Sequence, residues 1–158
     1  MTGIFAIGKN GEFANNDKLL GMIKEDLQFF KEKTTDQITV MGRKTWDSLP
    51  KKLPNRENWV FSTNQTQMVK PNGLPDLIFD DFEKLLTQIK NTHKDVFVIG
   101  GKQLIESLIN EIDTLIITTF PKEYETDVVL DLEKILTGFK KKKEIKKPIQ
   151  SELGFITI

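Results

Sequence analysis

The chain has 158 residues, 23 basic and 23 acidic side chains and a formal net charge of zero. This length predicts one domain over residues 1–158, and the balanced charge gives no overall signature of a nucleic-acid-binding or membrane-binding protein. Cysteine is absent, which excludes disulfide bonds, thiolate metal ligands and cysteine nucleophiles. No stretch approaches the ~20 apolar residues of a membrane span, so we expect a cytoplasmic protein, with a monomer as the default.

Short apolar runs alternate with helical patterns over most of the chain. Strands are expected at Gly3–Ile7, Ile38–Met41, Trp59–Ser62, Leu77–Phe79, Val96–Ile99 and Leu115–Phe120. Helices with apolar residues at i, i+3 and i+4 are expected at Lys24–Lys33, Phe82–Lys90 and Lys102–Ile109. Because several strands are apolar without alternation, the pattern predicts an α/β fold whose mostly parallel central sheet carries helices on both faces. The end differs, since Phe139–Lys147 and Gly154–Ile158 predict a C-terminal antiparallel hairpin.

The segment Gly8–Ile23 is long and poor in signals for helix or strand. A segment of this length inside a compact domain is usually functional or mobile. We interpret it as an active-site lid, with a tolerated surface loop as the alternative.

A glycine followed by two cations and a hydroxyl residue marks the stretch Val40–Pro50, which reads VMGRKTWDSLP. The apolar run before this glycine places Gly42 at a strand-to-helix turn. Backbone N–H groups and the side chains of Arg43, Lys44 and Thr45 can face a phosphate there.

A second glycine turn of the same kind lies in Val96–Lys102, which reads VFVIGGK. Taken alone, Gly100–Gly101 also fits an ordinary strand-to-helix turn. Two turns that can bind phosphate suit a ligand with several phosphates, such as a dinucleotide.

A carboxylate, Asp26, falls in the middle of the apolar arc of the expected Lys24–Lys33 helix. With about 100° per residue, Phe30 and Ile23 flank it on one side and Phe29 on the other. An acid in that position is either buried with a partner or lines a cavity. The alternative is a residue of the first helical turn that is stabilised by free N–H groups and by the helix dipole. Together with the two glycine turns, Asp26 indicates a reductase that binds a nicotinamide cofactor.

Weaker signals predict ordinary structural roles. We expect His93 in an exposed loop, because no second histidine and no ligand set accompany it, and we expect no metal site. Trp46 and Trp59 are expected in the core, and Asp80–Asp81 at the start of a helix. The run Lys140–Lys143 predicts an edge strand protected against aggregation; a nucleic-acid patch is the alternative, which the balanced charge disfavours.

The ordered motifs resemble those of the dihydrofolate reductase family over nearly the whole chain. The resemblance is carried by NG at Asn10–Gly11, DKL at Asp17–Leu19, EDLQFFKEKT at Glu25–Thr34, VMGRKTWDSLP at Val40–Pro50, LPNREN at Leu53–Asn58, FSTN at Phe61–Asn64 and VIGGK at Val98–Lys102. It implies an eight-stranded mixed sheet and the reduction of 7,8-dihydrofolate by NADPH, with hydride transfer to C6 and protonation at N5. It also implies inhibition by antifolates and a role in one-carbon and thymidylate metabolism.

On the substrate side, the resemblance implies that Asp26 is catalytic and holds the pterin ring, while Thr118 supports that carboxylate through a hydrogen bond. Arg56 would bind the glutamate tail, because its planar fork fits a carboxylate through two hydrogen bonds. The alternative for Arg56 is a surface cation. Apolar walls around the substrate would come from Ile4, Leu27, Phe30, Leu49, Leu53 and Ile99.

On the cofactor side, Ala6 and Leu19 would flank the nicotinamide, and Thr45 with the turn at Gly42 would bind the pyrophosphate. Glycine suits these turns because a side chain would block the approach of the diphosphate to the backbone. Further cofactor contacts are implied for Phe13, Lys44, Ile99, Gly100, Gly101, Lys102, Gln103 and Leu104.

Selection of NADPH over NADH would depend on Arg43, Ser62 and Thr63, which the resemblance places around the 2′-phosphate.

The chain departs from the family pattern around the nicotinamide. Leu20 and Gly21 replace the usual proline and tryptophan of the lid, and further changes fall at Ala14, Lys24, Ile105 and Val128. Our hypothesis is an active enzyme with slower chemistry or lid closure, because glycine loosens the backbone and cannot order a water as tryptophan does. Two alternatives are a related reductase that acts on a pyrimidine and a non-catalytic relative that binds folate or NADPH.

Overall fold

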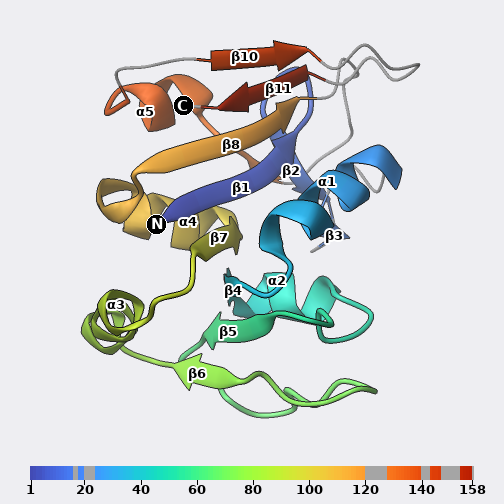
Figure 1. Ribbon diagram of the computed structural model, residues 1–158, viewed down its shortest axis with the longest axis vertical. Helices are drawn as coiled ribbons and strands as arrows, with labels where there is room; N and C mark the ends of the chain where they lie inside the picture. The colour runs from blue at the N-terminus through green and yellow to red at the C-terminus, as the bar shows by residue number, and fades with distance from the viewer. Residues whose placement is uncertain (16–17, 20–23, 120–127, 140–142, 147–153, 158) are drawn as a thin grey trace.

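The computed structural model describes residues 1–15, 18–19, 24–119, 128–139, 143–146 and 154–157, and side chains within residues 1–13, 27–119 and 128–139. The central sheet has eight strands in the order β10–β11–β8–β1–β7–β4–β5–β6 (Figure 1). Their bounds are β1 (Thr2–Ile7), β4 (Ile38–Gly42), β5 (Glu57–Phe61), β6 (Leu77–Phe79), β7 (Val96–Gly100), β8 (Thr114–Thr119), β10 (Lys143–Lys146) and β11 (Gly154–Thr157).

The pairing confirms the predicted α/β fold with a mostly parallel sheet. Each pairing from β8 to β6 is parallel, whereas β11 pairs antiparallel with both β8 and β10. The C-terminal hairpin is therefore present, with β10 as an edge strand of the sheet. The lysines expected to protect this edge have side chains outside the described part of the chain.

The helices cover both faces of the sheet, as the uninterrupted apolar strands predict. The helical elements are α1 (Lys24–Thr34), α2 (Arg43–Ser48), α3 (Phe82–Asn91), α4 (Lys102–Leu108), the 3₁₀ helix η1 (Ile109–Glu111) and α5 (Leu132–Leu136). Leu85 of α3 and Leu104 of α4 belong to one core cluster, whereas Trp46 of α2 belongs to a second, against which Phe30 of α1 packs. Two apolar layers therefore enclose the sheet.

Alternation along the strands divides the core between these two layers. In β7, Val98 packs on the side of α3 and α4, and Ile99 packs on the side of α1 and α2. In β1, Phe5 and Ile4 divide in the same way. Successive side chains of a strand point to opposite faces, so a fully apolar strand contributes to both layers. This geometry brings Ile4 and Ile99 to the face that carries the site described below.

The segment Gly8–Ile23 contains short strands that its sequence did not predict, while its interpretation as a lid stays a prediction. It contains β2 (Glu12–Asn15) and β3 (Lys18–Leu19), which form a three-stranded sheet with β9 (Val128–Val129). The strands are too short for an apolar pattern, and their partner lies more than a hundred residues away in the sequence. Only tertiary contacts reveal them.

Several local predictions are confirmed. Asp81 begins α3, where its side chain accepts hydrogen bonds from the backbone N–H groups of Glu83 and Lys84. Trp46 and Trp59 are buried, and His93 is exposed. The short helix α5 was not expected from the sequence. Among the residues the structure describes, no helix has the length and apolar character needed to cross a membrane.

Candidate active site

An apolar cleft of about 380 Å³ lies on the face of the sheet that α1 and α2 cover. Its walls come from the strands β1, β2, β7 and β8, from α1 and from the segment between α2 and β5. The lining residues are Ile4, Phe5, Ala6, Phe13, Leu27, Phe29, Phe30, Lys31, Leu49, Pro50, Lys51, Leu53, Pro54, Arg56, Ile99 and Thr118. Ile99 and Thr118 stand near the carboxyl ends of parallel strands, which is where open α/β sheets bind their ligands.

The cleft brings together the predicted substrate residues whose side chains the structure describes. Residues from β1, β2, α1, β7, β8 and the segment between α2 and β5, which are far apart in the sequence, meet in this one space. The described members of the predicted set are Ile4, Leu27, Phe30, Leu49, Leu53, Arg56, Ile99 and Thr118, with Ala6 and Phe13 from the predicted cofactor set.

Asp26 belongs to α1, one residue before Leu27, but its side chain lies outside the described part of the chain. Thr118 is 2% exposed and stands opposite Ala6 in the pairing of β8 with β1. The predicted hydrogen bond between the carboxylate of Asp26 and Thr118 therefore stays a prediction. What the structure does show is a buried hydroxyl residue in the cleft wall.

Arg56 lies in the cleft wall and is held by uncharged groups. Its Nε donates to the carbonyl oxygen of Pro54 at 3.0 Å, and its Nη1 donates to the hydroxyl of Thr34 at 3.2 Å. The guanidinium carbon lies 5.7 Å from the ring centroid of Phe30. Burial lowers the pKa of Arg56 below its ordinary value, because the cation loses hydration. An arginine stays charged at neutral pH under such a shift, so the cleft contains a partly dehydrated cation.

The two glycine turns predicted from the sequence lie side by side. Strands β4 and β7 are parallel neighbours, and Met41 pairs with Gly100. A Cβ atom placed at Gly42 would lie 3.6 Å from the backbone nitrogen of Gly101. The two turns therefore form one surface of closely approaching backbone.

Space at this double turn is limited. Gly100 has φ +146°, and a Cβ atom there would lie 3.1 Å from Oγ1 of Thr45 and 3.2 Å from a ring carbon of Phe13. The peptide bond between Gly100 and Gly101 is cis. Glycine is required here both by the backbone conformation and by the close approach of Thr45 and Phe13.

Arg43 follows the first turn and ties it to the segment after β5. Its Nε donates to both carboxylate oxygens of Asp47, at 3.0 and 3.1 Å. Its Nη1 donates to the carbonyl oxygen of Asn64 at 2.8 Å, and Nη2 to that of Gln67 at 3.3 Å. The hydroxyl of Ser62 donates to the same carbonyl of Asn64 at 2.6 Å. Two of the residues predicted to hold a 2′-phosphate are thus joined through one carbonyl group.

The other predicted cofactor residues occupy varied environments. Lys44, Thr63 and Gln103 are exposed, Thr45 is buried, and Leu104 packs within the core layer of α3 and α4 instead of lining the cleft. The side chain of Leu19 lies outside the described part of the chain, as do Leu20 and Gly21. The hypothesis of slower lid closure therefore stays a prediction.

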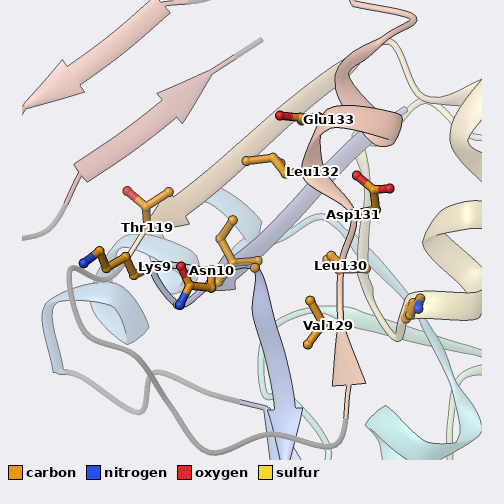
Figure 2. A pocket seen from close by; sticks show the side chains of 12 residues that line it. Lys9, Asn10, Thr119, Val129, Leu130, Asp131, Leu132 and Glu133 are labelled. Carbon is orange, nitrogen blue, oxygen red and sulfur yellow. The ribbon is translucent and has the colours of Figure 1, made fainter.

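A second hollow of about 500 Å³ shares no lining residue with the cleft. In Figure 2, Lys9, Asn10 and Thr119 gather on one side of it, and the residues from Val129 to Glu133 on the other. Lys102, which was predicted to bind the cofactor, lines this hollow. Its Nζ lies 4.0 Å from a carboxylate oxygen of Glu106, one turn further along α4.

The sequence did not single out several residues that line or support the cleft. Phe5, Phe29 and Lys31 line it, although each neighbours a residue that was predicted. Thr34 supports Arg56 from below the surface, and Phe61 stacks on Phe82 at 4.2 Å beside Ser62. Phe29 and Thr34 both lie inside the motif EDLQFFKEKT at Glu25–Thr34, although the resemblance assigned neither of them a role.

Comparison with known proteins agrees with this geometry. The family model described as "Dihydrofolate reductase" matches residues 1–152. A dihydrofolate reductase of Mycoplasma genitalium is 37% identical over 134 residues, which cover 84% of this chain and 84% of the relative. Another, from Ureaplasma parvum, is 34% identical over 125 residues, covering 78% and 77%.

A solved structure is similar over almost the full length. It is the dihydrofolate reductase of Enterococcus faecalis in complex with NADP(H) and RAB-propyl, with a TM-score of 0.82, 25% identity and coverage of 99% of this chain and 93% of that one. The fold and the matches define an NADPH-dependent oxidoreductase, which confirms the predicted class. The chain belongs to the dihydrofolate reductase family. The alternative of a pyrimidine reductase is not favoured.

Proposed function

We propose that this chain reduces 7,8-dihydrofolate to tetrahydrofolate with NADPH, in the apolar cleft and at the double glycine turn. The observation that supports this proposal is the position of Arg56. The cleft carries a partly dehydrated cation beside apolar walls that would accept a flat heterocycle and a benzoyl ring. A folate has this distribution of groups, with an anionic tail beyond two planar aromatic systems.

The substrate would lie between α1 and the segment before β5. Leu27, Phe30 and Leu53 would pack on its rings, and the guanidinium of Arg56 would bind the tail carboxylate through two parallel hydrogen bonds. Asp26 would accept hydrogen bonds from the amino edge of the pterin and favour protonation at N5, with water as the immediate proton donor. Thr118 would hold that carboxylate in place. These positions keep the reacting carbon inside the cleft and exclude bulk water from it.

The double turn fits the phosphates of the cofactor. Gly42, Gly100 and Gly101 bring backbone together where side chains would intrude, and the hydroxyl of Thr45 stands at the same point. Ala6 and Ile99 would form the floor under the nicotinamide next to the cleft. NADPH, when bound, supplies the hydride that reduces C6. The chain supplies the position of both reactants and the electrostatic environment.

Arg43, Ser62 and Thr63 would bind the 2′-phosphate. The joint hold of Arg43 and Ser62 on the carbonyl of Asn64 supports this role, because it fixes both side chains at one end of β5. A doubly charged phosphate favours a planar cation that is already oriented.

We further propose that the protein is a cytoplasmic monomer, that it binds no nucleic acid and that antifolates inhibit it. The balanced charge supports the absence of a nucleic-acid role. Light scattering, which measures the molar mass of the purified protein in solution, tests whether it is a monomer.

The experiment that tests the activity follows NADPH absorbance after dihydrofolate is added to the purified protein. We expect NADPH to be consumed in step with dihydrofolate, and an antifolate to stop the reaction. NADPH binding without consumption would instead favour the non-catalytic relative.

A further inference from the structure

The hydroxyl of Thr34 is the point at which helix α1 meets Arg56. Thr34 is the last residue of α1 and is 0% exposed. Its Oγ1 donates to the carbonyl oxygen of Phe30 at 2.8 Å and accepts from Nη1 of Arg56 at 3.2 Å. One hydroxyl thereby links the end of the helix to a cation that comes from the segment before β5.

Three contacts restrict the guanidinium plane of Arg56. Nε donates to the carbonyl of Pro54, Nη1 donates to the hydroxyl of Thr34, and the guanidinium carbon lies over the ring of Phe30. An arginine has five N–H donors, of which these contacts use two. Within the described residues, the donors of Nη2 and the second donor of Nη1 are left to meet a carboxylate side by side. The orientation of these free donors depends on the hydrogen bonds that Nε and Nη1 make to Pro54 and Thr34.

We propose that Thr34 is the positioning residue that sets the orientation of Arg56 for the carboxylate of the substrate tail. This inference rests on the proposed role of Arg56. Thr34 does not line the cleft, so it acts through the two cleft residues that its hydroxyl bonds, the guanidinium of Arg56 and the backbone carbonyl of Phe30. An arginine without this hold keeps its charge but loses the fixed geometry on which two parallel hydrogen bonds depend.

Thr35 offers a matched control on the same turn of the chain. Its Oγ1 donates to the carbonyl oxygen of Lys31 at 2.6 Å, which is the same hydroxyl-to-backbone bond that Thr34 makes to Phe30. Among the described residues, the hydroxyl that bonds Arg56 belongs to Thr34 and not to Thr35. Thr34→Val and Thr35→Val therefore each remove one hydroxyl bond to a backbone carbonyl four residues earlier, and only the first also removes the hydrogen bond to the arginine.

The test compares ligands with and without the glutamate tail. Substrates are dihydrofolate and 6-methyl-7,8-dihydropterin, and inhibitors are methotrexate, which has the tail, and trimethoprim, which lacks it. We expect Thr34→Val to raise the KM for dihydrofolate and the Kd for methotrexate roughly threefold to tenfold, with kcat little changed. The tail-free ligands should bind as they do to the wild type, and Thr35→Val should match the wild type throughout.

Three outcomes would overturn the proposal. One is an unchanged KM for dihydrofolate in Thr34→Val. Another is an equal loss for tailed and tail-free ligands, which would indicate a general change of the cleft. The third concerns Thr34→Ser, a small change that keeps the hydroxyl. If this variant loses as much affinity for the tailed ligands as the valine variant does, the hydroxyl is not the cause.

A double-mutant cycle separates this proposal from the proposed role of Arg56. Arg56→Ala alone should weaken the binding of dihydrofolate and of methotrexate, the two ligands that carry the tail. If binding of both is unchanged, Arg56 does not bind the tail, and the proposed tail site is refuted independently of Thr34. If binding is weakened, adding Thr34→Val in the Arg56→Ala background should cause no further loss. A full additional loss would show that Thr34 acts by another route.

Discussion

Two arginines border the proposed substrate and cofactor sites, and their surroundings differ in charge. Arg56 is held by a carbonyl, a hydroxyl and an aromatic ring, whereas Arg43 is paired with the carboxylate of Asp47. The first is partly dehydrated and the second is joined to an acid that is half exposed. A cation surrounded by neutral groups attracts an anionic ligand with its full charge. A neighbouring acid offsets part of that attraction.

Asp47→Asn tests this contrast at the cofactor end. The amide oxygen can still accept from Nε of Arg43, while the negative charge near the proposed 2′-phosphate is removed. We expect the KM for NADPH to fall about twofold to threefold, as befits one partly exposed ion pair, with the KM for NADH unchanged. Steady-state kinetics with both cofactors measure this. A higher KM for NADPH would show that the carboxylate serves mainly to orient the arginine.

Asp26→Asn tests the catalytic acid. The amide is similar in size but cannot carry the charge that would favour protonation of the pterin, so we expect turnover at neutral pH to fall by about a hundredfold or more. The melting temperature serves as the control for folding. Nearly full activity on dihydrofolate would refute the catalytic role.

At the scale of elements, the double turn depends on the parallel neighbours β4 and β7. Their register brings Met41 opposite Gly100, so two turns separated by more than fifty residues in sequence meet at one edge. A parallel sheet aligns the carboxyl ends of its strands, which is why similar turns after both strands come together. The sequence showed each turn, and the sheet order supplies their contact.

Gly100→Ala tests that contact. At φ +146° an alanine is strained, and its Cβ would lie 3.1 Å from Oγ1 of Thr45. We expect a loss of stability of about 1–3 kcal/mol and weaker binding of NADPH. Urea unfolding and cofactor titration by fluorescence measure the two effects. Gly138→Ala provides the control, since nothing lies within 4 Å of its added carbon; equal behaviour of the two variants would contradict the crowding at the turn.

At the scale of the whole molecule, the core cluster under α3 and α4 reaches the cleft through Phe5 and Phe13, and its other described members lie away from the cleft. Leu115 of β8 is 0% exposed in the cluster that packs under α3 and α4, and it does not line the cleft. Damage in this layer should therefore affect stability before it affects ligand binding.

Leu115→Ala tests this separation. Removing a fully buried leucine side chain leaves a cavity and should cost about 2–5 kcal/mol of unfolding free energy. We expect a lower melting temperature with an unchanged KM for dihydrofolate below the transition. Leu74→Ala is the control, because Leu74 is 54% exposed. A large change of KM in the Leu115 variant would mean that the two layers are coupled.

The main architecture could be predicted because it depends on long apolar runs. The apolar composition of Val96–Gly100 predicts a strand, and the capping residue and apolar spacing of Phe82–Asn91 predict a helix. Short elements could not be predicted in this way. β2 and β9 each carry only a few residues, and their pairing depends on two segments far apart in the sequence that the fold brings together.

For the site, the sequence indicated which residues could act but not how they are held. Arg56 follows from the motif LPNREN, whereas its hold by Thr34 depends on how the end of α1 packs on the segment before β5. Distances of this kind arise from tertiary packing, which a linear pattern does not encode. The same holds for the junction of Arg43 and Ser62 at the carbonyl of Asn64.

The neutral setting of Arg56 has a consequence for inhibitor design. In the described part of the chain, its hydrogen-bond partners carry no charge, so a compound that ends in an anion supplies a counter-charge that these partners do not provide. A neutral compound that covers this arginine removes more of its water and gives no compensation. Drugs aimed at this cleft would therefore gain from a short acidic extension, or from leaving the guanidinium open to solvent.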